Sequence, residues 1–246
     1  MRLKSALRRG VAAAVIAGIV VSSGIPAYAK TWNIADGDIT VKGASDESGN
    51  YNNVKQGEKD FEKDEGETVI TGESDKNTVT IDTSEGNVDV TFDDLKIDVS
   101  GKAEGDVSGD GPVDAGKAAV TVKGDHDAAI ELDGDNELKS GAGHAGLEHN
   151  KTDTSGELTI QDKDKNGSLE AAGGFKGAGI GSAGSNDAQV KITGGNITAT
   201  SDDWGAGIGS GSYGTGTVEI TGGEINIAGT NTIDHVAVAA LSLIHI

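Results

Sequence analysis

One hexapeptide, GAGIGS, occurs twice in this chain of 246 residues, at Gly177–Ser182 and at Gly205–Ser210. The residues that follow repeat at the same offset of 28 positions, so that Ile180 aligns with Ile208 and the tetrapeptide ITGG aligns with its second copy. Self-similarity at a period of about 20–50 residues is typical of repeat architectures. We therefore expect a fold built from stacked copies of one short unit.

Two weaker copies of the unit lie upstream. The third copy has the anchors Leu147, Ile160 and Leu169, which precede their counterparts by 33, 32 and 28 positions. The fourth copy is set from Val120, Ile130 and Leu138. Loops of variable length between fixed strands explain an offset that drifts by a few positions.

Each unit contains three short stretches in which apolar and polar residues alternate, as in QVKI, NITAT and VEI. This period of two predicts β-strands, and the Gly, Asn, Asp and Ser residues between them predict turns. Three strands in each short repeat predict an all-β fold, a parallel β-helix. The main alternative is a β-sandwich with antiparallel pairing. We place a strand and capping region at residues 30–66 and the β-helix repeats at residues 67–240.

Composition restricts how such a stack is filled. Only eight residues are aromatic and 39 are Gly, so aliphatic side chains must form the core. We expect no long helix outside residues 1–29. The residues predicted to face inward are Ile180, Ile192, Ile197, Ile208, Ile220 and Ile225.

The glycines of the repeat also match G-x-G-x-x-G, the fingerprint of dinucleotide-binding loops. The matching residues are Gly179, Gly181 and Gly184, and then Gly209, Gly211 and Gly214. That fingerprint requires a helix directly after it, whereas strand-like stretches follow here. We interpret the glycines as tight corners and as points where successive turns of the chain approach closely.

The first 29 residues have the pattern of a signal peptide. Arg2, Lys4, Arg8 and Arg9 precede an apolar stretch, and Ala27-Tyr28-Ala29 provides a cleavage site. Cleavage after Ala29 removes four basic residues and no acidic ones, which changes the formal net charge from −20 to −24. We expect a secreted or cell-wall-associated protein.

The mature chain contains no Arg and no Cys. Because nucleic acids and anionic lipids bind to positive surfaces, we expect neither a nucleic-acid partner nor membrane insertion after signal cleavage. The absence of Cys excludes disulfides.

Two other segments are expected to lie outside the stack. Ser100–Gly116 is polar, rich in Gly and contains Pro112, which predicts a long loop. The last six residues, 241–246, spell LSLIHI, which is the translation of a common sequencing-library adapter. We interpret these six residues as an artefact at the end of a metagenomic fragment.

Four segments together resemble a known family. They are HDAAIELDGDNELKSGAGHAGLEHN, GELTIQDKDKNGSLEAAGGFKGAGIGS, AQVKITGGNITATSDDWGAGIGS and GTVEITGGEINIAG. They are similar to the Gly-rich right-handed parallel β-helix repeats of secreted or wall-attached proteins of Gram-positive, often gut-dwelling, bacteria. Such proteins are often labelled carbohydrate-binding, so the resemblance implies a β-helix, an extracellular location and a glycan partner.

Three aromatic residues next to the GAGIGS copies are candidates for stacking on sugar rings: Trp204, Tyr213 and Phe175. The alternative is that they are ordinary surface residues. Trp32, at the start of the mature chain, is expected to cap the first turn of the stack.

The segment DKDKNGSLE begins like a calcium-binding loop, with Asp162, Asp164 and Asn166 at alternate positions. The twelfth position of such a loop is a Glu, whereas Gly173 stands here, and flanking helices are absent from the pattern. We favour a polar turn and keep a weak calcium site, with these three residues as ligands, as the alternative. No other cofactor is expected.

No catalytic set can be assembled from the sequence. His144 and His149 lack the H-E-x-x-H spacing of a zinc protease, and we expect both in loops. A polysaccharide lyase needs a cation beside the substrate carboxylate, and the mature chain has no Arg. The leading hypothesis is a non-catalytic, glycan-binding surface protein. A structural stalk or adhesin that contacts host or neighbouring cells ranks second, and a polysaccharide-degrading enzyme ranks third.

Overall fold

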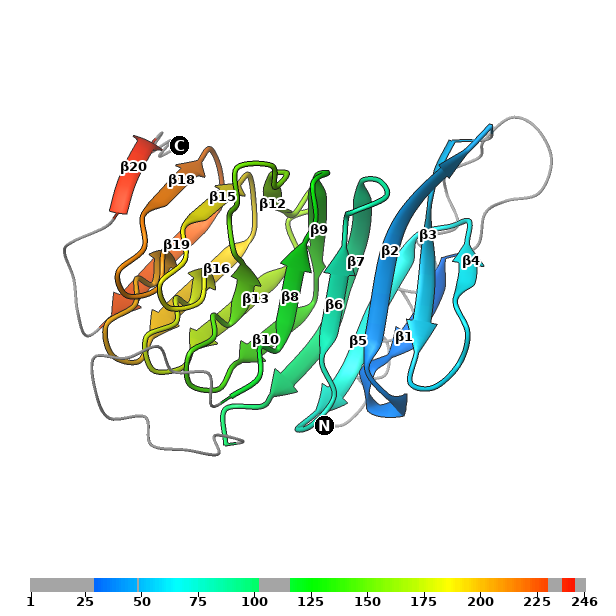
Figure 1. Ribbon diagram of the computed structural model, residues 1–246, viewed down its shortest axis with the longest axis horizontal. Helices are drawn as coiled ribbons and strands as arrows, with labels where there is room; N and C mark the ends of the chain where they lie inside the picture. The colour runs from blue at the N-terminus through cyan, green and yellow to red at the C-terminus, as the bar shows by residue number, and fades with distance from the viewer. Residues whose placement is uncertain (1–28, 48, 102–115, 230–235, 242–246) are drawn as a thin grey trace, which may run out of the picture.

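The computed structural model describes residues 29–47, 49–101, 116–229 and 236–241, and in this part the protein is all-β (Figure 1). The only helical element among these residues is a short 3-10 helix, η2 (Ile34–Asp36). The strands form one 12-stranded sheet and one 8-stranded sheet. The predicted all-β class is confirmed.

Most of the 8-stranded sheet is a single row of parallel strands, which we call row 1. In spatial order, row 1 consists of β2 (Ile39–Asp46), β6 (Val79–Asp82), β8 (Val120–Lys123), β11 (Leu147–His149), β14 (Ile180–Gly181) and β17 (Ile208–Gly209). Beyond β2, the sheet continues with the antiparallel strands β3 (Gly49–Gln56) and β4 (Glu62–Asp64).

The 12-stranded sheet contains two rows that are joined by one long strand, β7 (Val88–Asp98). Row 2 starts with the first half of β7 and continues with β9 (Ala128–Asp133), β12 (Leu158–Gln161), β15 (Ala188–Ile192), β18 (Gly216–Ile220) and β20 (Val236–Leu241). Row 3 starts with the second half of β7 and continues with β10 (Asp135–Lys139), β13 (Ser168–Gly173), β16 (Asn196–Ser201) and β19 (Glu224–Gly229). On the opposite edge of β7 lies β5 (Thr68–Ser74), which pairs with β1 (Lys30–Asn33).

The chain visits the rows in a fixed order. It passes through row 1, row 2 and row 3 as β8-β9-β10, then as β11-β12-β13, β14-β15-β16 and β17-β18-β19. All strand pairs except β2–β3 and β3–β4 are parallel. Figure 1 shows these passes stacked along the long axis of the molecule, from β1–β5 at one end to β18–β20 at the other. This arrangement is compatible with a β-solenoid, and the antiparallel sandwich is wrong.

The register of the strands reproduces the sequence repeat. The pairs at the offset of 28 are Ile180 with Ile208, Ile192 with Ile220, and Ile197 with Ile225. The anchors of the third copy pair as predicted, Leu147 with Ile180, Ile160 with Ile192, and Leu169 with Ile197. The insertions that change the offset therefore lie in the loops.

The predicted fourth copy agrees with the strand register in rows 1 and 2 but not in row 3. Val120 pairs with Leu147 and Ile130 pairs with Ile160, whereas Leu138 pairs with Ala171 and not with Leu169. The partner of Leu169 is Asn136, a buried polar residue. A shift of two positions keeps Leu138 on the inner face, because strands repeat every two residues.

One continuous aliphatic core runs between the rows. Five of the six predicted inward residues are buried, and Ile225 packs partly buried against the core in the last repeat. Of the described aromatic residues, Trp32 and Phe92 belong to this core. The prediction that aliphatic side chains fill the interior is confirmed.

A buried polar network fixes the first strands to one another. The Asp64 carboxylate accepts hydrogen bonds from the Trp32 indole and the Thr68 hydroxyl, each at 3.0 Å. The Asn52 amide donates to Thr68 at 2.9 Å and to the Asp89 backbone carbonyl at 2.8 Å. Because buried polar groups are costly when they lack partners, this network ties β1, β3, β4, β5 and β7 into one unit.

The glycines of GAGIGS have the role that the sequence predicts. A Cβ on Gly205 would lie 2.1 Å from the carbonyl oxygen of Gly177, and a Cβ on Gly177 would lie 1.9 Å from that of His144. Gly181 and Gly209 adopt positive φ values of 134° and 133°. The repeat therefore requires glycine both for close stacking and for its corners.

Several expectations concern residues beyond this part of the chain. Residues 1–28 of the expected signal peptide, residues 102–115 of the expected loop and residues 242–246 of the expected adapter segment lie outside the described residues. Within the described ranges, no helix is long and apolar enough to cross a membrane.

Candidate functional site

The three aromatic residues predicted to stack on sugars lie in the loops on either side of row 1, near the end of the stack. Phe175 is in the loop between β13 and β14, and Trp204 is in the equivalent loop of the next repeat, between β16 and β17. Tyr213 follows β17, in the loop that leads to β18. We call these three residues the aromatic corner.

Two members of the aromatic corner share one lysine. The Lys176 ammonium lies 5.4 Å from the centre of the Phe175 ring and 6.0 Å from that of Tyr213. The Lys176 backbone also links the loops, because its N–H donates to Asp203 and its carbonyl accepts from Ser212. The structure therefore connects Phe175 and Tyr213, and it places Trp204 one repeat beyond Lys176.

Exposure distinguishes the three rings. Trp204 and Tyr213 are 47% and 58% exposed, whereas Phe175 is half-buried. Trp204 and Tyr213 therefore offer aromatic surface to solvent, and Phe175 is linked to Tyr213 through Lys176.

The backbone at both exposed rings is strained. Trp204 has a φ of 73° and Tyr213 a φ of 64°, in the left-handed region that glycine or asparagine adopts at lower cost. The residues one repeat earlier, Lys176 and Ser185, have the same conformation, with φ values of 69° and 65°. The corner geometry is thus a property of the repeat, and the aromatic side chains are an addition to it.

The residues of the predicted calcium loop form a capped turn after β12. The Asp162 carboxylate accepts hydrogen bonds from the backbone N–H groups of Asn166 and Gly167, both at 3.2 Å. The Asn166 side chain turns away and donates to Asp133 at 2.8 Å. These contacts are those of a polar turn, the interpretation favoured from the sequence.

Two of the three predicted ligands do come together, with a partner that the sequence did not indicate. Carboxylate oxygens of Glu131, Asp162 and Asp164 lie within 4.8 Å of one another. Oxygen ligands of this kind suit calcium. The Lys163 ammonium, however, lies 3.2 Å from Glu131 and already balances part of the negative charge. The calcium site remains a prediction, with Glu131 replacing Asn166 in the cluster.

The same turn borders a groove of about 620 Å³ on the outer face of row 2, which we call the Tyr51 groove. Its floor is formed by outward residues of β7, β9 and β12, and one wall is formed by β3 and the segment before β5. The polar and aromatic residues that line it include Asn50, Tyr51, Glu67, Asn87, Asp89, Thr91, Glu131, Asp133, Gln161, Lys163 and Asp164.

Carboxylates in and beside the Tyr51 groove disfavour one another's ionised forms. Burial, together with repulsion from Asp133 and Asp162, raises the pKa of Asp164. Burial and repulsion from Asp133, Asp94 and Glu67 raise the pKa of Asp93. Asp133 contributes to both shifts, because its carboxylate repels the negative charge of Asp164 and of Asp93.

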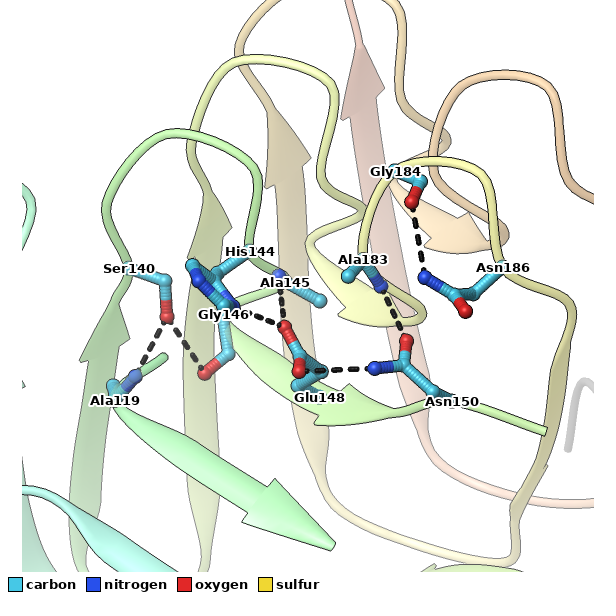
Figure 2. Close-up of polar contacts among 10 residues, drawn as sticks. All are labelled: Ala119, Ser140, His144, Ala145, Gly146, Glu148, Asn150, Ala183, Gly184 and Asn186. Carbon is cyan, nitrogen blue, oxygen red and sulfur yellow. Dashed lines mark hydrogen bonds and ion pairs between the residues drawn. The ribbon is translucent and has the colours of Figure 1, made fainter. Parts of the chain in front are cut away.

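A second polar cluster covers the outer face of β11 (Figure 2). The buried Glu148 carboxylate contacts His144 Nδ1 at 2.8 Å, the Ala145 N–H at 3.2 Å and the Asn150 amide at 3.1 Å. The Asn150 side-chain oxygen in turn accepts from the Ala183 N–H of the next repeat at 2.8 Å. These contacts join the loops around β11 to one another, which indicates that the cluster fixes their arrangement.

The sequence placed one of the two histidines wrongly. His144 lies in the loop between β10 and β11, as predicted, whereas His149 is the last residue of β11 and is buried. Its Nδ1 lies 3.1 Å from the Gln189 carbonyl oxygen, and burial lowers its pKa. The two rings belong to different environments and form no metal site together.

Comparison of the chain with protein-family models, curated proteins and solved structures finds no match.

Proposed function

We propose that this protein is an exported, non-catalytic right-handed parallel β-helix that binds glycans through Trp204 and Tyr213. The observation that carries the proposal is that two large aromatic side chains are about half exposed at strained corner positions of adjacent loops. Strained backbone conformations of this kind cluster at ligand-binding and active sites. Flat aromatic rings that face solvent suit the apolar faces of sugar rings.

The repeat supports this function in a second way. Parallel strands place equivalent loops at a spacing of about 4.8 Å, so a ligand with its own repeat can contact several loops at once. Weak contacts then add through effective concentration. Neutral glycans are the preferred ligands, because the net charge of −20 on the full chain opposes polyanions. Secretion or attachment to a cell wall follows from the signal-like N-terminus.

The test is a glycan array, probed with and without calcium, using the wild-type protein and the variants Trp204→Ala and Tyr213→Ala. We expect binding that weakens in both variants and persists in the control Phe61→Ala, which removes another exposed ring, 43% exposed, from a different region. Loss of binding only when calcium is removed would assign the contact to the Glu131–Asp162–Asp164 cluster instead. No binding to any glycan would favour the stalk or adhesin.

A further inference from the structure

The Tyr51 groove is separate from the aromatic corner. Its floor lies on the first half of β7 and on β9 and β12, whereas the corner lies in the loops on either side of row 1 in the last two repeats. Its volume of about 620 Å³ falls in the range of small-molecule and cofactor sites, about 300–1,000 Å³. The groove is therefore large enough to hold a ligand of its own.

Hydrogen bonds hold the wall of the groove rigidly on its floor. Asn52 donates from β3 to the Asp89 carbonyl of β7 at 2.8 Å. The Thr91 hydroxyl of β7 donates to the Glu67 carboxylate at 2.6 Å. These two bonds connect the wall to β7 in the floor, so the protein's own contacts form the groove.

One aromatic ring lines the wall. Tyr51 is half-buried, and the Lys63 ammonium lies 4.2 Å from its ring centre. Lys63 is itself paired with Asp46 at 2.8 Å and Glu65 at 3.0 Å. The cation–π contact orients the ring, which can then present its remaining surface to a sugar.

The lining of the groove provides groups that bind hydroxyls. Asn50, Asn87 and Gln161 contribute amides, which both donate and accept hydrogen bonds. Carboxylates accept hydrogen bonds from hydroxyl and ammonium groups. The lining thus combines a ring, amides and carboxylates, a set that fits a polyhydroxylated ligand better than an apolar one.

The charge of the lining selects among such ligands. Five carboxylates line the groove, those of Glu67, Asp89, Glu131, Asp133 and Asp164, against the single ammonium of Lys163. That ammonium is already paired with Glu131. A ligand that carries positive charge therefore gains Coulomb energy here, and a uronic acid chain is repelled.

We propose that the Tyr51 groove is a binding site for an oligosaccharide that carries free amino groups. The ring and the amides contact the sugar rings and hydroxyls, and the carboxylates of β9 and of the turn after β12 pair with the protonated amines. This proposal extends glycan binding to a second site and does not depend on the aromatic corner.

The test is calorimetry with three hexamers at slightly acidic pH and moderate salt: glucosamine, N-acetylglucosamine and lysine. We expect the glucosamine hexamer to bind about tenfold more tightly than the other two, a difference of about 1.4 kcal/mol. Tyr51→Ala and Asp164→Asn should each weaken its binding at least fivefold, while Tyr51→Phe, which keeps the ring, should retain it.

A control variant shows whether binding depends on the Tyr51 groove itself. Glu224→Gln makes the same charge change as Asp164→Asn at an exposed position of β19, and it should leave glucosamine-hexamer binding unchanged. If the lysine hexamer bound equally well, the groove would recognise only positive charge. If the N-acetylated hexamer bound equally well, the groove would not recognise the amino groups. Either result, or full binding by folded Tyr51→Ala, would overturn the proposal.

Discussion

Asn136 lies directly opposite Leu169 in the register of β10 and β13, at an inner position that is apolar in the three following repeats. It is 3% exposed, and both its side-chain oxygen and its amide have hydrogen-bond partners. The side-chain oxygen accepts from the Leu95 N–H at 2.9 Å, and the amide donates to the carbonyl oxygens of Asp133 and Ser168, both at 3.0 Å. Asn136 therefore joins three successive passes of the chain.

We expect Asn136→Ala to lower the free energy of unfolding by about 2–3 kcal/mol, because it leaves the buried Leu95 N–H without a partner. Denaturant titration measures the change. Asn196→Ala, an exposed asparagine on β16, is the control and should change stability by no more than about 0.5 kcal/mol. If Asn136→Leu were as stable as the wild-type protein, stability would depend on filling this inner position and not on the hydrogen bonds of Asn136.

The second prediction concerns the close approach of successive repeats. Gly205→Ala places a methyl group 2.1 Å from the Gly177 carbonyl oxygen, so the backbone of one loop must move. We expect a loss of about 1–3 kcal/mol, the usual range for overpacking, and a lower thermal midpoint. Gly101→Ala, whose added methyl group would meet no atom within 4 Å, should be nearly neutral. Equal stability of the two variants would contradict the packing seen in the structure.

The repeat could be predicted from the sequence because its evidence is local and periodic. Ile180, Ile192 and Ile197 recur at one offset, and parallel stacking requires the register that this offset describes. The predicted alignment of the fourth copy is wrong at Asn136. A polar residue occupies an inner position there, and the nearest aliphatic residue, Leu138, lies two positions further on. His149 was misplaced for the same reason, since a buried polar side chain in a short strand resembles a loop residue.

The Tyr51 groove could not be predicted from the sequence. Tyr51 and Asp164 are far apart in the chain, and they border one groove because β3 folds back beside β2. Glu131 reaches the Asp162 turn only through the pairing of β9 with β12. The aromatic corner was found because its residues adjoin the repeated hexapeptide.

The left-handed backbone at Trp204 leads to a third prediction. In this conformation a Cβ atom crowds the following carbonyl oxygen, at a cost of about 1–2 kcal/mol. Glycine avoids this cost. Its greater conformational freedom in the unfolded state, however, disfavours folding by about 0.5–1 kcal/mol. We therefore expect Trp204→Gly to be up to about 1.5 kcal/mol more stable than Trp204→Ala. Thermal unfolding of the two variants measures the difference, and a less stable glycine variant would show that the backbone there is unstrained.

The fourth prediction concerns pH and His149. Burial lowers the pKa of this imidazole in the folded state, so the folded protein holds it neutral while the unfolded chain takes up a proton near its ordinary pKa of about 6.5. The unfolded state then binds more protons, and stability falls as the pH drops below that value. The loss is at most about 1.4 kcal/mol per pH unit, and it ends at the lower pKa of the folded state.

The control variant for this prediction is His149→Val, because Val122 is the register partner of His149 in β8 and occupies the equivalent inner position. The wild-type protein has many carboxylates, whose titration also changes stability, so the informative quantity is the difference between the two proteins at each pH. We expect this difference to be constant above neutral pH and to shift in favour of His149→Val as the pH falls below about 6.5. Parallel stability profiles of the two proteins, measured by urea unfolding from neutral to mildly acidic pH, would show that His149 is protonated equally in the folded and unfolded states.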